Sequence, residues 1–397
     1  MKAGRFRFNG KNVLMLGTAA ALAPLMAASV ASAVPSAADC VTFAAEVSAR
    51  LAAGNVYVRE QVTAEKNADE ADVSEAAAEE DKPDTANAYL SLDDSFMLSR
   101  GELLIPSGEN EEIEVPKEHD SGAEPYPESL ESRDGVISAL TYGFYQGDDY
   151  ITLDGGGQVR NMTSVSNDVL LEESRKPYDF NVERNSEPQV LIMHTHETES
   201  YEPYTRDFYD SSFTSRTTDD SMNMAAVGDK IAEQLEGAGI GVIHDVTKHD
   251  YPSYNGSYDR SRVTALDILA ENPSIKVVLD IHRDAIERAD GTRIAPTAEI
   301  NGKNAAQVMI INGCDDGTMG MPDYMKNFRF ASALQQQLEE DFPGLTRPVL
   351  FDYRQYNQDL TTGSILIEVG GHANSIDEAL YSGELIGRAL ADLFSDT

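Results

Sequence analysis

From about Pro188 to the C-terminus, short apolar runs alternate with stretches in which apolar residues recur every three or four positions. The runs predict buried strands, and the periodic stretches predict helices that pack on them. The expected strands are Val190–Met193, Ile240–Ile243, Ile275–Ile281, Gln307–Ile311 and Ser364–Val369. The expected helices are Asp219–Ala238, Ser261–Ala270, Tyr324–Glu339 and Ile376–Phe394. This order is typical of an α/β fold with a single doubly wound, mostly parallel sheet, and we assign it to residues 188–397.

The sequence before this domain divides into three parts. Residues 1–33 have basic residues, then an apolar run, then Ala31-Ser32-Ala33. This order predicts a signal peptide or, if it is not cut, an N-terminal membrane anchor; either would export the rest of the chain. Residues 34–135 are rich in Ala, Glu, Asp, Ser and Pro and predict a largely disordered acidic linker, either a simple tether or a docking region. Residues 136–187 are expected to be a partly ordered lead-in.

Composition excludes several classes of protein. The chain has 397 residues, a formal net charge of −37, two cysteines and no tryptophan. Nucleic acid is not an expected partner, because binding to a phosphate backbone requires a basic surface. Two cysteines cannot staple a small disulfide scaffold, and no pair has the CxxC spacing of a structural zinc site.

Polar residues follow three of the predicted strands at their carboxyl ends. The first strand runs into His194 and His196, the third into His282, and the last into Glu368. Ligands of open parallel sheets bind outside the carboxyl ends of the strands, so these side chains are expected to share one crevice.

Two imidazoles and a carboxylate suit a mononuclear zinc site with one position left for water. His194 and His196 are two residues apart, and we expect only one of them to be a ligand while the other supports it or faces the substrate. Glu368 suits the role of general base and acid, although a buried strand carboxylate paired with an arginine would also fit.

Three segments together carry a resemblance to a known family. These are VLIMHTHETESY (190–201), NPSIKVVLDIHRDA (272–285) and YNQDLTTGSILIEVGG (356–371). They resemble the stage II sporulation protein P family, whose fold is similar to that of zinc-dependent N-acetylmuramoyl-L-alanine amidases. The resemblance covers about residues 188–394 in order. It implies an exported peptidoglycan hydrolase that cuts the bond between muramic acid and the stem peptide and can also act on cross-links.

The resemblance to the broader group of zinc-dependent amidases also implies site residues. His196 and His282 match its two zinc-binding histidines, and Glu368 matches its catalytic glutamate. The pattern's third ligand is a glutamate that opens a helix, whereas the corresponding helix here opens with Asp219 and Asp220. Asp220 is our choice for the third ligand. Glu199 and His194 are its competitors.

Substrate contacts are assigned to Arg283, which could grip a stem-peptide carboxylate, to Tyr201, which could stack on sugar or peptide, and to Asn357. Each also fits a loop anchor. Further tyrosines that could stack in the same way fall in predicted loops near the strand ends: Tyr204, Tyr251, Tyr254 and Tyr258.

The resemblance implies two partners of sporulation besides peptidoglycan, a lytic transglycosylase of the stage II sporulation protein D type and a membrane protein. Two alternatives stay open: a non-catalytic wall-binding or scaffold protein with the same fold, and a vegetative cell-separation amidase.

Overall fold

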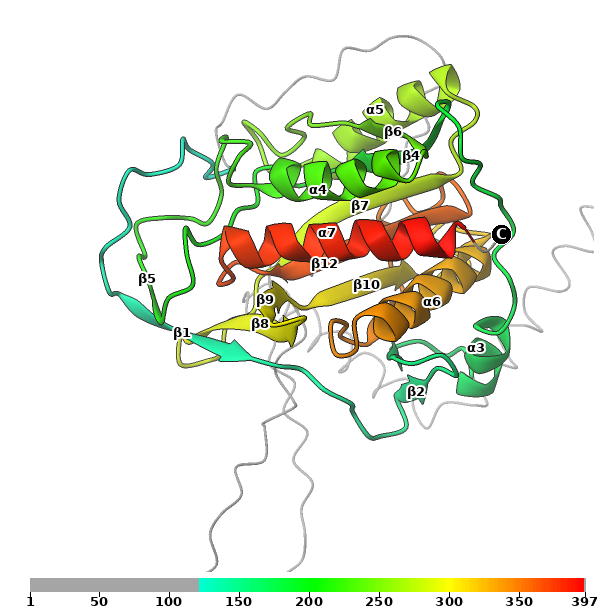
Figure 1. Ribbon diagram of the computed structural model, residues 1–397, viewed down its shortest axis with the longest axis horizontal. Helices are drawn as coiled ribbons and strands as arrows, with labels where there is room; N and C mark the ends of the chain where they lie inside the picture. Colours follow the sequence, from blue (N-terminus) through cyan, green and yellow to red (C-terminus); the bar gives the residue numbers. More distant parts are fainter. Residues whose placement is uncertain (1–120, 396–397) are drawn as a thin grey trace, which may run out of the picture. The chain divides into compact units, whose positions relative to one another are not determined.

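The computed structural model describes residues 121–395, and eight of their strands form the main sheet (Figure 1). Across the sheet the order is β2 (Tyr150–Thr152), β3 (Gln158–Asn161), β11 (Val349–Asp352), β10 (Val308–Gly313), β12 (Gly363–Gly371), β7 (Val277–Asp284), β4 (Pro188–Met193) and β6 (Gly241–His244). Neighbouring strands are parallel except for β2 with β3 and β10 with β12. The mostly parallel sheet that the sequence predicts is therefore confirmed.

Helices cover both faces of this sheet, as expected for a doubly wound fold. The helices are α3 (Asn167–Glu173), α4 (Met224–Gly237), α5 (Ser257–Glu271), α6 (Tyr324–Asp341) and α7 (Ile376–Leu393). Apolar residues of α4, α6 and α7 pack with one face of the sheet in the main core, whereas Ala265 of α5 packs with Leu191, Met193 and Val278 on the other face. Figure 1 shows α4, α7 and α6 side by side in front of the sheet.

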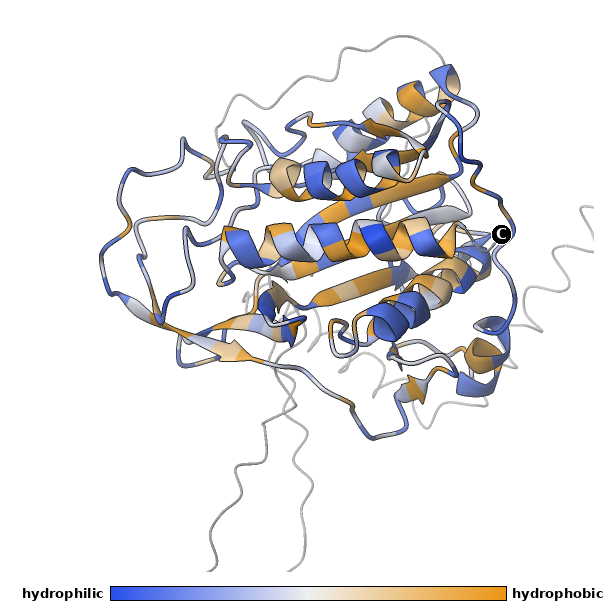
Figure 2. Cartoon of the chain, in the orientation of Figure 1, coloured by the Kyte–Doolittle hydropathy of each residue, from blue (hydrophilic) through white to orange (hydrophobic). Residues whose placement is uncertain are grey.

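Strand β7 extends past Ile281, where the sequence predicts its end, and continues to Asp284. Figure 2 shows it change from hydrophobic to hydrophilic along its length. The polar residues that were expected to follow the strand therefore lie within it, and successive side chains point to opposite faces. Asp280 and His282 share the face of Val278, which is the face that α5 covers.

Helix α4 begins at Met224 rather than at Asp219 as predicted. The carboxylate of Asp219 accepts hydrogen bonds from the backbone N–H and the hydroxyl of Ser221, which makes a turn of these residues. Asn223 then caps the helix by accepting the N–H of Ala225. Asp220 consequently does not lie in the first helical turn.

A second sheet, which the sequence pattern did not predict, packs beside the first. Its order is β5 (Phe208–Tyr209), β1 (Gly135–Leu140), β8 (Arg293–Ile300) and β9 (Lys303–Ala306). Strands β8 and β9 form a hairpin whose turn residues Asn301 and Gly302 have φ of +50° and +77°. This hairpin separates β7 from β10 along the chain.

The described residues before Pro188 contribute to the domain. Strands β2 and β3, from the expected lead-in, join the main sheet. Ala123 and Leu130, at the end of the expected linker, are buried, and the Tyr126 hydroxyl donates to the carbonyl of Tyr201. Residues 1–33 and the linker up to residue 120 lie outside the described residues. Between residues 121 and 395, no helix has both the length and the apolar character needed to cross a bilayer.

Cys314 follows β10 and is buried. Its N–H donates to the carbonyl of Asp352 at 2.8 Å, and burial raises the pKa of the thiol to about 11. The thiol is therefore an unreactive core group at neutral pH.

Candidate metal centre

Three segments bring polar side chains together at the carboxyl ends of the central strands. The segment after β4 carries His196 and Glu199, β7 carries His282, and β12 carries Glu368. In the register of β12 with β7, Glu368 is the direct partner of His282. Both side chains therefore lie on the face of the sheet that α5 covers.

His196, Glu199 and His282 form one group that could hold a cation. One ligand atom from each lies within 4.8 Å of the others, and all three residues are buried. The two carboxylate oxygens of Glu199 are divided between the imidazoles: Oε1 is 3.6 Å from Nδ1 of His196, and Oε2 is 3.6 Å from Nδ1 of His282. The imidazole planes are 77° apart, with ring centroids separated by 5.0 Å. Both Nδ1 atoms thus face one small space beside a carboxylate.

The electrostatics of this group favour the carboxylate anion. Burial alone would raise the pKa of Glu199, but the charge of Arg283 and the two imidazoles outweigh it and hold that pKa well below its usual range. Burial would likewise lower the pKa of His282, but Asp280 and Glu199 raise it well above its usual value. The carboxylates of Asp280 and Glu199 thus stabilise a positive charge on His282 between them.

The other nitrogen of each imidazole faces a supporting side chain. Nε2 of His196 is 3.0 Å from the hydroxyl of Ser257, in the first turn of α5. Nε2 of His282 is 2.9 Å from Oδ1 of Asp280 on the same strand. Such outer contacts fix the orientation of imidazole ligands in metal sites. Sequence analysis assigned no role to either Ser257 or Asp280.

Aromatic rings line one side of the group. The Tyr254 ring stacks on the imidazole of His196, with centroids 4.6 Å apart. The guanidinium of Arg216 also lies over the Tyr254 ring, 4.7 Å from the ring centroid. Tyr258 lies between His282 and Tyr356, parallel to both rings. Two of the tyrosines that the sequence placed near the strand ends are therefore at the site.

The structure places the three candidates for the third ligand in different surroundings. Glu199 contacts both histidines, as described above. Asp220 is exposed and pairs with Lys248. His194 points to the opposite face of the sheet, where its Nδ1 is 3.0 Å from the carbonyl of Ile281 and its Nε2 is 2.8 Å from Nε2 of His244. Only Glu199 of these three lies with His196 and His282.

The three residues expected to contact substrate are held by protein groups. The Arg283 guanidinium donates to the carbonyls of Ser200 and Ser215, which fixes the segment after β4. Tyr201 is fully buried, and its hydroxyl donates to the carbonyl of Val369 at 2.9 Å. The Asn357 amide donates to the carbonyl of Tyr258 at 3.0 Å. In this structure each side chain supports the walls of the site.

The donor set fits Zn²⁺. Two imidazole nitrogens and one carboxylate are the ligands of many catalytic zinc sites, which keep a further position for water or substrate. Here a carboxylate anion and two supported imidazoles converge on one space, and Glu368 is adjacent to it on the next strand.

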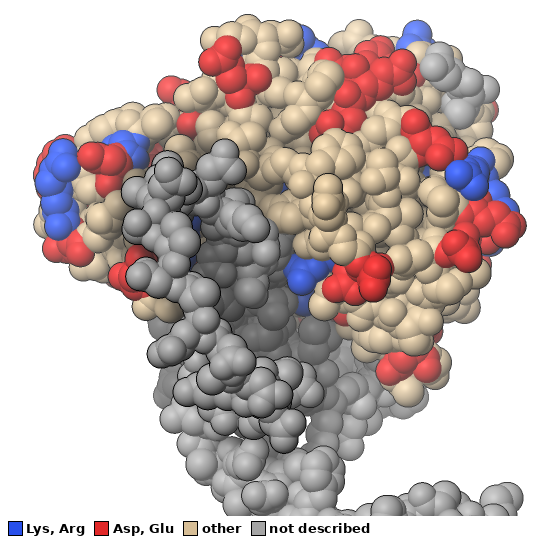
Figure 3. Space-filling model, turned by 90° about the horizontal axis from the view of Figure 1, so that it is seen from below, with Lys and Arg blue, Asp and Glu red and all other residues tan. Residues whose placement is uncertain are grey.

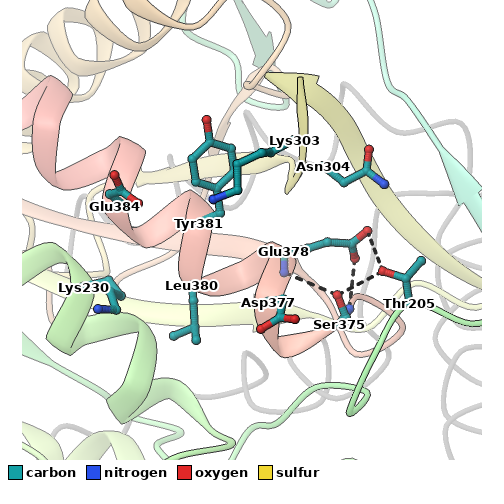
Figure 4. A pocket seen from close by; sticks show the side chains of 10 residues that line it. All are labelled: Thr205, Lys230, Lys303, Asn304, Ser375, Asp377, Glu378, Leu380, Tyr381 and Glu384. Atoms are coloured by element: carbon teal, nitrogen blue, oxygen red, sulfur yellow. Dashed lines mark hydrogen bonds between the residues drawn. The ribbon is translucent and has the colours of Figure 1, made fainter. Parts of the chain in front are cut away.

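A surface pocket of roughly 530 Å³ lies elsewhere, over α7 and β9 (Figure 4). The figure shows Lys303 beside the ring of Tyr381, whereas Glu378 turns toward Ser375 and Thr205. None of its lining residues belongs to the histidine group. The molecular face drawn in Figure 3 is mostly uncharged, with acidic groups scattered over it and several basic groups beside them.

Comparisons with known proteins match most of the chain to one family. The family model for stage II sporulation protein P matches residues 47–391. Stage II sporulation protein P of Bacillus subtilis (strain 168) is 31% identical over 344 residues, which are 78% of this chain and 76% of that protein.

Solved structures show weaker likeness. The N-acetylmuramoyl-L-alanine amidase AmiC2 of Nostoc punctiforme is 13% identical, covering 53% of this chain and 97% of that chain, with a TM-score of 0.32. The CwlD amidase from Clostridioides difficile, solved in complex with the GerS lipoprotein, is 14% identical, covering 52% and 94%, with a TM-score of 0.31. These scores are too low to carry a conclusion. The family model and the Bacillus relative suffice, and the chain belongs to the stage II sporulation protein P family.

Proposed function

We propose that this protein is a zinc-dependent peptidoglycan hydrolase of sporulation that cleaves the amide between N-acetylmuramic acid and the L-alanine of the stem peptide, and that it also acts on stem-peptide cross-links. The family supplies the biological setting. The observation that carries the chemistry is the His196, Glu199 and His282 group with Glu368 in register beside it.

His196, Glu199 and His282 would hold the metal. When bound, Zn²⁺ would polarise the amide carbonyl and acidify a water molecule. Neighbouring groups would orient these three residues. Ser257 contacts the imidazole of His196, and Asp280 contacts that of His282. The backbone N–H of Arg283 donates to Oε2 of Glu199 at 3.1 Å. Glu199 is thereby fixed between two imidazoles and a backbone donor.

Glu368 is proposed as the general base and acid. A carboxylate in this place can accept a proton from water at one oxygen and return it to the leaving amide nitrogen. Gly370, which follows it, has a φ of +64°, and a Cβ there would lie 2.6 Å from Oδ1 of Asn374 and 2.7 Å from Cβ of Ala306. The glycine therefore permits the irregularity within β12 that shifts its register with β7 between Glu368 and Gly371.

The proposal also covers the export of the chain, its substrate and its partners. Residues 1–33 would direct export as a signal peptide or a membrane anchor, and the acidic segment that follows would tether residues 188–397 outside the membrane. Peptidoglycan is the proposed substrate. A stage II sporulation protein D-type lytic transglycosylase and a membrane protein are the proposed partners.

The assay incubates the purified chain with isolated sacculi and identifies the released fragments by mass spectrometry. Release of stem peptides with a free L-alanine amino group is expected, with loss after chelation and recovery with Zn²⁺. A non-catalytic scaffold would bind sacculi and release nothing. Release of disaccharides or of cross-link fragments alone would refute the amidase assignment.

A further inference from the structure

Asp280 connects two parts of the proposed metal centre. On one side its Oδ1 is 2.9 Å from Nε2 of His282. On the other side the same oxygen accepts the N–H of Thr195 at 2.8 Å, and Oδ2 accepts the Thr195 hydroxyl at 2.7 Å. Thr195 is the residue immediately before His196. One buried carboxylate therefore contacts a candidate ligand and the backbone beside another.

The contacts of Asp280 distinguish the two nitrogens of His282. The carboxylate of Asp280 can only accept a hydrogen bond, and its charge favours a proton on the Nε2 that it approaches, although the two atoms do not meet with hydrogen-bond geometry. The lone pair of a neutral imidazole is then on Nδ1, which faces Glu199. His196 has the same orientation, with Nδ1 toward Glu199 and Nε2 toward Ser257. Each histidine thus presents Nδ1 to the common space.

The Thr195 contacts extend the same support to the segment after β4. The Thr195 hydroxyl is 2.8 Å from the hydroxyl of Ser261, one turn of α5 beyond Ser257. Asp280, Thr195 and α5 therefore form a continuous set of buried contacts around the backbone of His196. Displacement of the carboxylate would loosen both histidines together.

We propose that Asp280 is a positioning residue that holds His282 with the proton on Nε2, so that His282 binds the metal through Nδ1, and that it fixes His196 through Thr195. This inference rests on the proposed function, since it concerns the same zinc site. Its role is distinct from ligation, because neither oxygen of Asp280 faces the common space. Loss of such outer contacts weakens metal affinity by about 10- to 100-fold.

Asp284 offers a matched control on the same strand. It lies two residues beyond His282, as Asp280 lies two residues before it, and it is also buried. Its Oδ2 pairs with Nη1 of Arg347 at 2.9 Å, and its Oδ1 accepts the N–H of Ala285. Asp284→Asn therefore removes a buried charge from the same strand without removing a contact to a candidate ligand.

The experiment compares Asp280→Asn and Asp284→Asn with the unchanged protein. Zinc affinity is measured by chelator competition, and the folding of each variant by circular dichroism. Asp280→Asn is expected to bind zinc about 10- to 100-fold more weakly. Asp284→Asn is expected to bind within about twofold of the unchanged protein, even if it melts at a lower temperature. Equal affinity in both variants would overturn the inference.

The tautomer of His282 gives a second, independent readout. Long-range ¹H–¹⁵N spectra of the zinc-loaded protein are expected to show the His282 proton on Nε2, and a proton on Nδ1 would overturn the inference. This measurement decides the matter even if Asp280→Asn does not fold. If the unchanged protein binds no zinc, the proposed function fails, and the same spectrum of the metal-free protein at alkaline pH still tests the Nε2 proton.

Discussion

Glu368 and His282 are direct partners in the register of two parallel strands, β12 and β7. Their side chains lie on the same face of the sheet, and the bulge in β12 comes only after Glu368. The strand pairing itself therefore sets the spacing between Glu368, the proposed general base and acid, and His282, a proposed metal ligand. This arrangement does not depend on the path of a loop.

Glu368→Gln is expected to keep zinc and lose activity. The amide has nearly the same shape but cannot accept and return a proton, and general acid–base catalysis contributes about 10²- to 10⁴-fold. The measurement is the rate of stem-peptide release at a zinc content confirmed by metal analysis. Glu384→Gln, a half-buried residue of α7 that pairs with Arg388, is the control. A Glu368→Gln protein with the full rate would exclude this role.

Replacement of the two acidic candidates for the third ligand should have opposite results. Glu199→Gln is expected to weaken zinc binding by more than the 10- to 100-fold or so that outer contacts contribute, because it removes an anion that faces both histidines. Asp220→Asn is expected to bind within about twofold of the unchanged protein, since Asp220 is exposed and pairs with Lys248. Chelator competition measures both. Weak binding by Asp220→Asn alone would restore the choice made from the sequence.

Ser257→Ala tests the support of His196. Loss of the hydroxyl 3.0 Å from Nε2 frees the imidazole to rotate, and zinc binding is expected to weaken by about tenfold. Ser382→Ala, in α7, is the matched control, because its buried hydroxyl lies within hydrogen-bond distance of the carbonyls of Ala306 in β9 and Glu378 in α7 and contacts no candidate ligand. Calorimetric titration with zinc measures both variants. The same affinity in the two would show that Ser257 does not orient His196.

Gly228→Ala is expected to destabilise the domain by about 1–3 kcal/mol. A Cβ at this position of α4 would lie 2.3 Å from Nε2 of His244 and 2.8 Å from Nε2 of His194, so the contact between the imidazoles must break or shift. Gly237→Ala, in the last turn, meets no atom within 4 Å and is expected to be neutral or to stabilise by up to about 1 kcal/mol. Urea unfolding measures both free energies. Equal values would contradict the prediction.

His372 makes stability depend on pH. Burial and then the charges of Arg283 and Arg293 lower the pKa of this imidazole well below its usual value. In the unfolded chain the group takes up a proton as pH falls through about 6.5, whereas the folded state does not. The free energy of unfolding should therefore fall below about pH 6.5, with a slope of up to about 1.4 kcal/mol per pH unit from this group.

His372→Gln is expected to make the pH dependence shallower between about pH 6.5 and 5, because glutamine does not titrate. Urea unfolding at a series of pH values provides the comparison. An unchanged slope would mean that the imidazole keeps an ordinary pKa in the folded protein.

The predicted helix Ile376–Phe394 agrees closely with α7, because local signals define it. Ser375 and Glu378 form a capping box at its start, and its apolar residues face the sheet. The grouping of the candidate site residues was also predictable in outline, since the carboxyl ends of parallel strands must meet along one edge. His196, His282 and Glu368 are on such strands or directly after one.

The position of Glu199, the proposed third ligand, could not be predicted from the sequence in the same way. Glu199 lies in an irregular segment, and its position depends on Arg216 and the N–H of Arg283, which are distant in sequence. The β8–β9 hairpin was missed although the Asn301–Gly302 pair is a known hairpin signal. Strand alternation could have shown that Arg283 faces away from His282, had β7 been extended beyond Ile281.

Chemical labelling of Cys314 can measure how often the domain opens. With a thiol pKa of about 11, only about 10⁻⁴ of the native molecules carry the reactive thiolate at pH 7, and the sulfur is shielded as well. Alkylation at this residue, located by mass spectrometry, therefore counts the molecules that have opened around the end of β10. The rate of that labelling, compared with the rate for an exposed thiol, gives the free energy of opening without denaturant and without an introduced cysteine.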